Sequence, residues 1–153
     1  MDFIQKILML LFSTSLCITS AWADDLVGNW KTIDDKTGFP RAVINIKQES
    51  DGTYTGKIEK IYALPNGTEP LGLCVKCNGN MKNKPMVGLN ILNGFTENKN
   101  KKNEYVHGQV LDPLTGNTYK GKIRMNQNGR TITLRGYVGT SLLGRSQTWI
   151  KMN

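Results

Sequence analysis

The two cysteines of Cys74-Val75-Lys76-Cys77 are the side chains whose type and spacing most suggest chemistry. Two cysteines at this spacing can form a small disulfide ring, exchange with other thiols or supply two sulfur ligands to a metal. A structural zinc site needs about four ligands, but beyond residue 23 the sequence adds only one histidine, His107. A redox role needs a thiolate stabilised at the start of a helix, and the sequence has no convincing amphipathic helix. We therefore expect a structural disulfide and no metal or cofactor, with thiol–disulfide exchange as the alternative.

Acid–base catalysis has weaker candidates. His107 lies between Val106 and Gly108 on a predicted strand, and the sequence shows no Ser/His/Asp order and no nucleophile elbow. Asp34 and Asp35 are adjacent, so on a strand they would face opposite sides and make a poor glycosidase pair. We expect them to begin a turn that ends at Gly38. We expect no catalytic residues and a non-enzymatic protein.

The first 23 residues are typical of a cleaved secretory signal peptide. Lys6 provides the positive start, residues 7–18 are mostly apolar, and Ala21-Trp22-Ala23 offers small residues for a signal peptidase. This apolar run is about a dozen residues, short of the roughly 20 that cross a bilayer as a helix. We expect a periplasmic or secreted protein without a membrane span, in which residues 24–153 form one β-barrel domain.

The chain is basic, with a formal net charge of +8. Removal of residues 1–23 takes away one acid and one base, so this charge is unchanged. In an exported protein, a basic balance points less to nucleic acid than to anionic lipid headgroups, glycans or acidic partners. The lysine-rich segment 97–104 has no interleaved aromatic residues of the kind that bind single-stranded nucleic acid. We interpret it as a solvated hairpin tip.

Alternating apolar and polar residues predict a succession of half-buried strands. In Thr118 to Met125, for example, Tyr119, Ile123 and Met125 share one face, while lysines and an arginine share the other. Gly-containing turns such as Ser50-Asp51-Gly52 separate the segments and suit antiparallel reversals. The predicted strands are Val27 to Ile33, Arg41 to Gln48, Tyr54 to Leu64, Met86 to Phe95, Tyr105 to Leu111, Thr118 to Met125, Thr131 to Val138 and Arg145 to Met152.

Glycines recur inside these segments. Thr53 to Ile58 matches Thr118 to Ile123 at five of six positions, including the glycine. Glycine within a strand often marks a bulge or bend where a sheet curls. The pattern therefore favours an all-β fold, an antiparallel up-and-down barrel of about eight strands, which holds packed side chains or one small ligand. A two-sheet β-sandwich is the alternative.

Several motifs carry a family resemblance. Gly28-Asn29-Trp30 is similar to the Gly-x-Trp opening of the calycin superfamily, the lipocalins and avidins, in which the tryptophan plugs one barrel end beneath a basic side chain from a late strand. Arg145 is the matching candidate. A longer set resembles domain-of-unknown-function family 2147, a group of small secreted bacterial proteins. This set comprises residues 30–38, Cys74 to Gly79, Lys84 to Leu89, Asp112 to Gly116, Arg135 to Gly139 and Gly144 to Trp149. The resemblance implies an exported calycin-like barrel of bacterial origin and brings no established activity.

The last predicted strand offers a candidate binding site. If Trp149 points inward, alternation places Arg145, Gln147 and Lys151 on the same inward face. The resemblance places Arg145 beside Trp30, and Asp34 or Asp35 can supply its carboxylate partner. Two interpretations stay open: a closing plug, or a site for a small polar or anionic ligand. The candidate ligand-binding residues are Trp30, Asp35, Tyr137, Arg145, Gln147 and Trp149.

A second candidate surface is the loop over residues 78–85, which follows the cysteines. Lys82 and Lys84 are available there to an acidic partner such as an envelope protein or glycan. We expect binding of a small ligand or an envelope partner as the function. The alternatives are a thiol–disulfide protein acting through Cys74 and Cys77, and a purely structural envelope component, which a completely filled barrel interior would favour.

Overall fold

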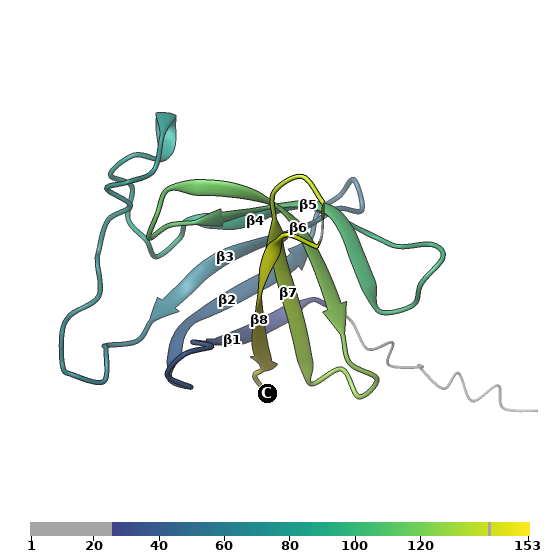
Figure 1. Cartoon of the computed structure of the whole chain (residues 1–153), viewed down its shortest axis with the longest axis horizontal. Coiled ribbons are helices and arrows are strands. Elements are labelled where there is room, and N and C mark those ends of the chain that lie inside the picture. Colours follow the sequence, from purple (N-terminus) through teal and green to yellow (C-terminus); the bar gives the residue numbers. More distant parts are fainter. Residues whose placement is uncertain (1–25, 141) are drawn as a thin grey trace, which may run out of the picture.

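The protein is a closed antiparallel β-barrel (Figure 1). The computed structural model describes residues 26–140 and 142–153, so the predicted signal peptide, residues 1–23, lies outside the described residues. Each strand pairs with the next along the chain, and β1 also pairs with β8. The predicted up-and-down barrel is confirmed, and the sandwich alternative is wrong. The strands are β1 (Gly28–Ile33), β2 (Pro40–Gln48), β3 (Tyr54–Ile61), β4 (Asn90–Glu97), β5 (Glu104–Asp112), β6 (Asn117–Met125), β7 (Thr131–Tyr137) and β8 (Gly144–Lys151).

Glycines shape the wall of the barrel by leaving room for one aromatic ring. Gly108 on β5 is paired with Gly121 on β6, and the buried Phe95 of β4 lies against both. A Cβ atom at Gly108 would lie 2.3 Å from the Phe95 ring, and one at Gly121 would lie 2.5 Å from it. These glycines therefore provide space for the ring, and the β5–β6 pairing is irregular between Tyr105 and Gly108.

The end of the barrel where β1 begins is closed by a tryptophan. Trp30 is fully buried, and its Nε1 donates a hydrogen bond of 2.8 Å to the carbonyl oxygen of Leu26. The cation that covers its ring is Lys151, whose Nζ lies 5.4 Å from the ring centroid. We call this the closed end.

The expectation that Arg145 covers Trp30 is wrong, and the register between β1 and β8 explains why. Trp30 is paired with Lys151 and Thr32 with Trp149. Arg145 is six residues before Lys151 in an extended strand, which places it roughly 20 Å further along β8. It therefore lies at the opposite end of the barrel, which we call the open end.

The β4–β5 hairpin at the closed end holds a buried carboxylate. Glu104 lies within 3.0 Å of Lys122 Nζ and accepts hydrogen bonds from Asn98 and Arg124. Burial would raise its pKa, but these cationic and amide donors outweigh burial and lower the pKa to about 2. The predicted solvated tip therefore describes the turn, whereas Glu104 is part of the folded barrel.

The long connection between β3 and β4 is tied to the open end. It contains the Cys74–Cys77 disulfide and a 3-10 helix, η1 (Gly79–Met81). Cys74 Sγ lies 3.4 Å from the carbonyl oxygen of Pro113, a packing contact because a disulfide sulfur has no hydrogen to donate. Gly116, with a φ of +77°, fits directly beneath the carbonyl of Lys76. The disulfide loop therefore rests on the β5–β6 turn. Within residues 26–140 and 142–153, the protein has no apolar helix of bilayer-spanning length.

Candidate functional site

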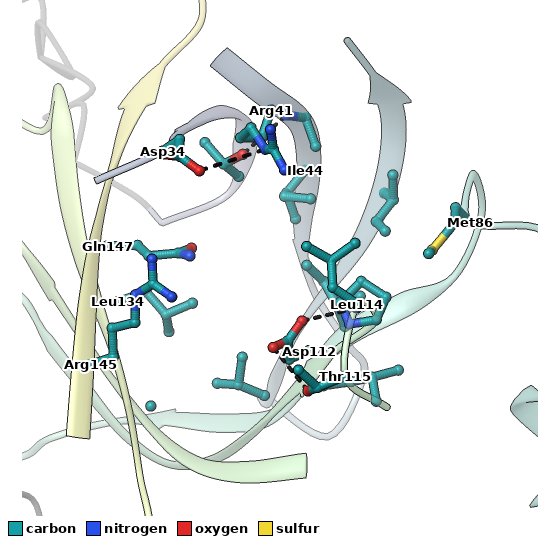
Figure 2. Close-up of a pocket in the computed structure, with 18 of the residues that line it drawn as sticks. Asp34, Arg41, Ile44, Met86, Asp112, Leu114, Thr115, Leu134, Arg145 and Gln147 are labelled. Carbon is teal, nitrogen blue, oxygen red and sulfur yellow. Dashed lines mark hydrogen bonds and ion pairs between the residues drawn. The ribbon is translucent and has the colours of Figure 1, made fainter. Parts of the chain in front are cut away.

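The barrel interior contains a cavity of about 780 Å³ that reaches the open end. Its size lies within the range of small-molecule sites. Side chains from the barrel strands and the β3–β4 connection line it, together with the β5–β6 and β7–β8 turns. Figure 2 shows how these side chains converge on the cavity.

Most of the cavity wall is apolar. Alternation along the strands turns Ile44, Ile58, Ile91 and Leu134 inward, as expected for the inner face of a barrel. The β3–β4 connection adds apolar side chains from outside the strands. They are Leu64, Pro70, Leu71 and Met86.

One polar group at the open end is the ion pair between Arg145 and Asp35. The Arg145 Nε donates to Asp35 Oδ2 at 3.1 Å, and Nη2 donates to Oδ1 in a second contact. The guanidinium hydrogen bond lowers the pKa of Asp35, and the same carboxylate raises the pKa of Arg145. Arg145 lines the cavity and its side chain is largely exposed. The group is therefore a charged arginine that solvent and a ligand can both reach.

Gln147 lies one inward position further along β8 and also lines the cavity (Figure 2). Its Oε1 accepts a hydrogen bond of 3.4 Å from Trp149 Nε1, which fixes the orientation of the amide. Trp149 is buried and forms part of the cavity wall. Strand β8 thus presents an arginine, an amide and an indole in succession on one face.

A second arginine lies across the cavity mouth. Arg41 Nε on β2 lies 3.8 Å from Asp34 Oδ2 in the β1–β2 turn. Asp34 also accepts hydrogen bonds from the backbone N–H of Thr37 and of Lys36, and the Thr37 bond lowers its pKa most. The predicted turn from Asp34 to Gly38 is present. Asp112 faces Arg145 from β5 and is held by Leu114 N and Thr115 Oγ1 (Figure 2).

The structure brings together most, but not all, of the predicted site residues. Tyr137, Arg145, Gln147 and Trp149 line the cavity, and Asp35 pairs with Arg145 from its edge. Trp30 does not line the cavity, because it is buried in the closed end.

Other residues of the site were not predicted from the sequence. Arg41 was predicted only as the first residue of a strand, and Asp34 only as part of a turn or a partner for Arg145. Both line the cavity at its mouth, Asp34 from the β1–β2 turn and Arg41 from the start of β2. Leu64 and Met86 were predicted to lie on strands, which is wrong: β3 ends at Ile61 and β4 begins at Asn90, so both belong to the irregular β3–β4 connection. Leu71, in the same connection, lies on no predicted strand.

Lys82 and Lys84 are exposed on the β3–β4 connection, near η1. Lys84 lines a second, smaller cavity of about 430 Å³ with Lys57 and the amide side chains of Asn80, Asn90 and Asn93. Lys82 does not line it. A role for either lysine in binding a partner stays a prediction.

The cysteine chemistry is restricted by burial. Cys74 and Cys77 form the expected disulfide, and both residues are buried. Attack by an external thiol requires access to one of the sulfurs. In the part of the chain that the structure describes, no three His, Cys, Asp or Glu side chains gather as a metal site would require. His107 is exposed on β5 with a φ of +63°, at a bulge in the pairing with β6.

Comparisons with known proteins agree with this geometry. Among curated proteins, none matches the chain. A solved structure described as "Protein HP1028 from the human pathogen Helicobacter pylori belongs to the lipocalin family" superposes with a TM-score of 0.69 at 16% identity and covers 84% of each chain. This likeness concerns the fold alone. The model of a family described as "Uncharacterized protein conserved in bacteria (DUF2147)" matches residues 28–151. The chain therefore belongs to the bacterial family DUF2147 and has a lipocalin-like barrel.

Proposed function

We propose that this protein binds a small amphipathic molecule in its barrel, with the apolar part inside and a polar or anionic head at the open end. The observation that carries this proposal is the cavity of about 780 Å³, which is lined mainly by aliphatic side chains and has Arg145 and Gln147 at one side. Burial of an apolar chain would provide most of the affinity. The guanidinium would select the head, because hydrogen bonds to a charged partner are stronger than neutral ones.

The ligand differs in one respect from the polar or anionic molecule expected from the sequence. Arg145 and Arg41 are each paired with an aspartate, so the mouth is not an uncompensated positive site. A small, wholly polar anion would gain little from the aliphatic wall and would compete with Asp35 for Arg145. An amphipathic anion can place its apolar chain against the aliphatic wall and its charged head beside Arg145.

Binding and release, without catalysis, is the class of function that we favour. The purely structural alternative depended on a filled interior, and the cavity argues against it. The thiol–disulfide alternative is disfavoured by the burial of both cysteines. We further propose export to the periplasm or the medium, supported by the signal-like residues 1–23. The intact mass of the protein recovered from its own host tests the export, with cleavage after Ala23 expected.

A fluorescent dansyl fatty acid tests the binding proposal by titration. We expect saturable binding with blue-shifted emission. Ala42 lines the cavity, and Ala42→Phe should fill part of it and weaken binding at least about tenfold. The matched control is Ala63→Phe, because Ala63 is exposed and lies outside the cavity. Thermal melts check that both variants are folded. If two folded variants bind the probe equally, the binding site is not in the lumen.

A further inference from the structure

Large apolar side chains are exposed around the mouth of the cavity. In the β7–β8 turn, the exposed fraction is 66% for Val138, 87% for Leu142 and 74% for Leu143. Phe39, Leu71 and Leu114 are also exposed, and they lie in the other three connections at the open end. We call these six residues the apolar rim. Leu71, Leu114, Val138 and Leu143 also line the cavity, so the apolar wall continues onto the outer surface.

The turns at the two ends of the barrel differ sharply in this respect, although Val27 and Met152 are each 36% exposed beside the closed end. The turns at the closed end are residues 49–53, 98–103 and 126–130, and they contain no Leu, Ile, Val, Met or aromatic residue. Exposed apolar side chains scattered singly are ordinary on proteins, whereas a group gathered in one place marks an interaction surface. The rim gathers six such residues from four separate connections.

Lysines accompany the rim. Lys36 is exposed in the same turn as Phe39, and the exposed Lys76 lies beside the turn that carries Leu114, as the contact between its carbonyl and Gly116 shows. Of the carboxylates at this end, Asp34 and Asp35 are paired with Arg41 and Arg145. Asp112 accepts hydrogen bonds within its own turn, and Glu69 is exposed two residues before Leu71. Aliphatic side chains flanked by uncommitted cations complement a bilayer, in which acyl chains lie beneath anionic headgroups.

From this arrangement we infer that the open end of the barrel docks onto an anionic lipid surface. The apolar rim enters the boundary of the acyl chains, and Lys36 and Lys76 contact the lipid phosphates. The mouth of the cavity then faces the membrane, so that an amphipathic ligand passes between bilayer and lumen without crossing water. This last step rests on the proposed function, whereas docking itself does not require it.

Flotation with vesicles tests the inference. The protein should float with vesicles of mixed phosphatidylglycerol and phosphatidylcholine and much less with phosphatidylcholine alone. Phe39→Ser/Leu142→Ser removes two rim side chains that do not line the cavity, and Lys36→Glu/Lys76→Glu reverses the two charges. Each pair should lower the partition coefficient about tenfold or more.

Matched controls come from elsewhere on the barrel. Ile150→Ser removes an exposed aliphatic side chain of β8 near the closed end, and Lys99→Glu/Lys102→Glu reverses two exposed charges in the β4–β5 turn. Both should partition as the unchanged protein does. The inference is overturned if the unchanged protein fails to float with anionic vesicles, or if the controls lose as much binding as the rim variants.

Two further results separate the possibilities. Light scattering compares the oligomeric state of the unchanged protein with that of Phe39→Ser/Leu142→Ser. If the unchanged protein is a dimer and the variant is a monomer, the rim binds a second copy of this chain, and lipid docking is overturned. Titration of the soluble dansyl probe without vesicles should give the same affinity for the rim variant and the unchanged protein. If the protein binds the probe but does not float, the docking inference fails and the lumen site stands. If it floats but does not bind the probe, the lumen site fails and the docking inference stands.

Discussion

Arg145 and Asp35 are 110 residues apart in sequence, yet they form a two-point ion pair at the open end of the barrel. Arg145 lines the cavity, whereas Asp35 does not. The arginine is therefore shared between the wall of the proposed ligand site and a carboxylate outside it. An anionic head that enters the cavity has to compete with Asp35 for the same guanidinium.

This competition predicts opposite effects for the two partners. Asp35→Asn should strengthen binding of dodecanoate, because the ligand no longer displaces a charged rival, and Arg145→Gln should weaken it, each by about tenfold. Isothermal titration calorimetry measures both. Dodecanol, which has the same chain and no charge, is the control and should bind all variants alike. Similar losses for dodecanol and dodecanoate in Arg145→Gln would show that Arg145 does not select the head.

Glu104 predicts how stability depends on pH. Its pKa is lowered to about 2 in the folded protein, from an ordinary value of 4.5, so the folded state favours the ionised carboxylate. The contribution of Glu104 to the free energy of unfolding is complete above about pH 4.5 and is lost as the pH falls towards 2. Glu104→Gln should lower the free energy of unfolding by about 2 kcal/mol at neutral pH. Urea titrations should show this difference shrinking below pH 4.5.

The control for Glu104 is Glu59→Gln, which changes an exposed carboxylate on β3. It should leave the free energy of unfolding almost unchanged at every pH. A deficit in Glu104→Gln that stays constant down to pH 2 would contradict the assignment of the low pKa to Glu104.

The close contact of Phe95 with two strand glycines predicts a strong effect of one methyl group. Gly121→Ala should lower the free energy of unfolding by about 2 kcal/mol, because the new Cβ would overlap the Phe95 ring. Gly136→Ala on the neighbouring strand is the matched control, since its Cβ would meet nothing closer than 3.6 Å. Phe95→Leu should recover part of the loss in Gly121→Ala. Equal destabilisation by both alanines would show that backbone freedom, and not space, explains the glycine.

Removal of the disulfide should change stability and dynamics mainly around the loop that it closes. Replacing both Cys74 and Cys77 by serine should cost about 2 kcal/mol, since so small a ring restricts the unfolded chain only slightly. Hydrogen exchange should speed up mainly in the β3–β4 connection and the β5–β6 turn on which it rests. The native bridge should resist exchange with glutathione because both cysteines are buried. Rapid exchange in the folded protein would revive the thiol–disulfide alternative.

The barrel could be predicted from the sequence because the signals for its strands and turns are local. Strict alternation in segments such as Thr118 to Met125 located strand β6 to within one residue, and Gly38, Gly52, Gly116 and Gly129 adopt the positive φ that their turns require. Burial and turn geometry are set by neighbours in the chain. These features therefore follow from short stretches of sequence.

The site was predicted less completely, because it depends on register and on an irregular connection. Inward alternation correctly grouped Arg145, Gln147 and Trp149, but nothing local states that Lys151, and not Arg145, lies opposite Trp30. A shift of six positions along β8 decides which end of the barrel receives the arginine. Leu71 and Met86 reach the cavity only through the fold of the β3–β4 connection.

Methyl NMR of the isoleucine side chains during titration with dodecanoate tests the central claim most directly. Ile44, Ile58, Ile61 and Ile91 line the cavity, whereas Ile46, Ile123 and Ile132 are buried and do not line it. Ligand in the lumen predicts large, saturable shifts in the first group and small ones in the second. Unchanged lumen methyl signals at saturating dodecanoate would contradict a binding site inside the barrel.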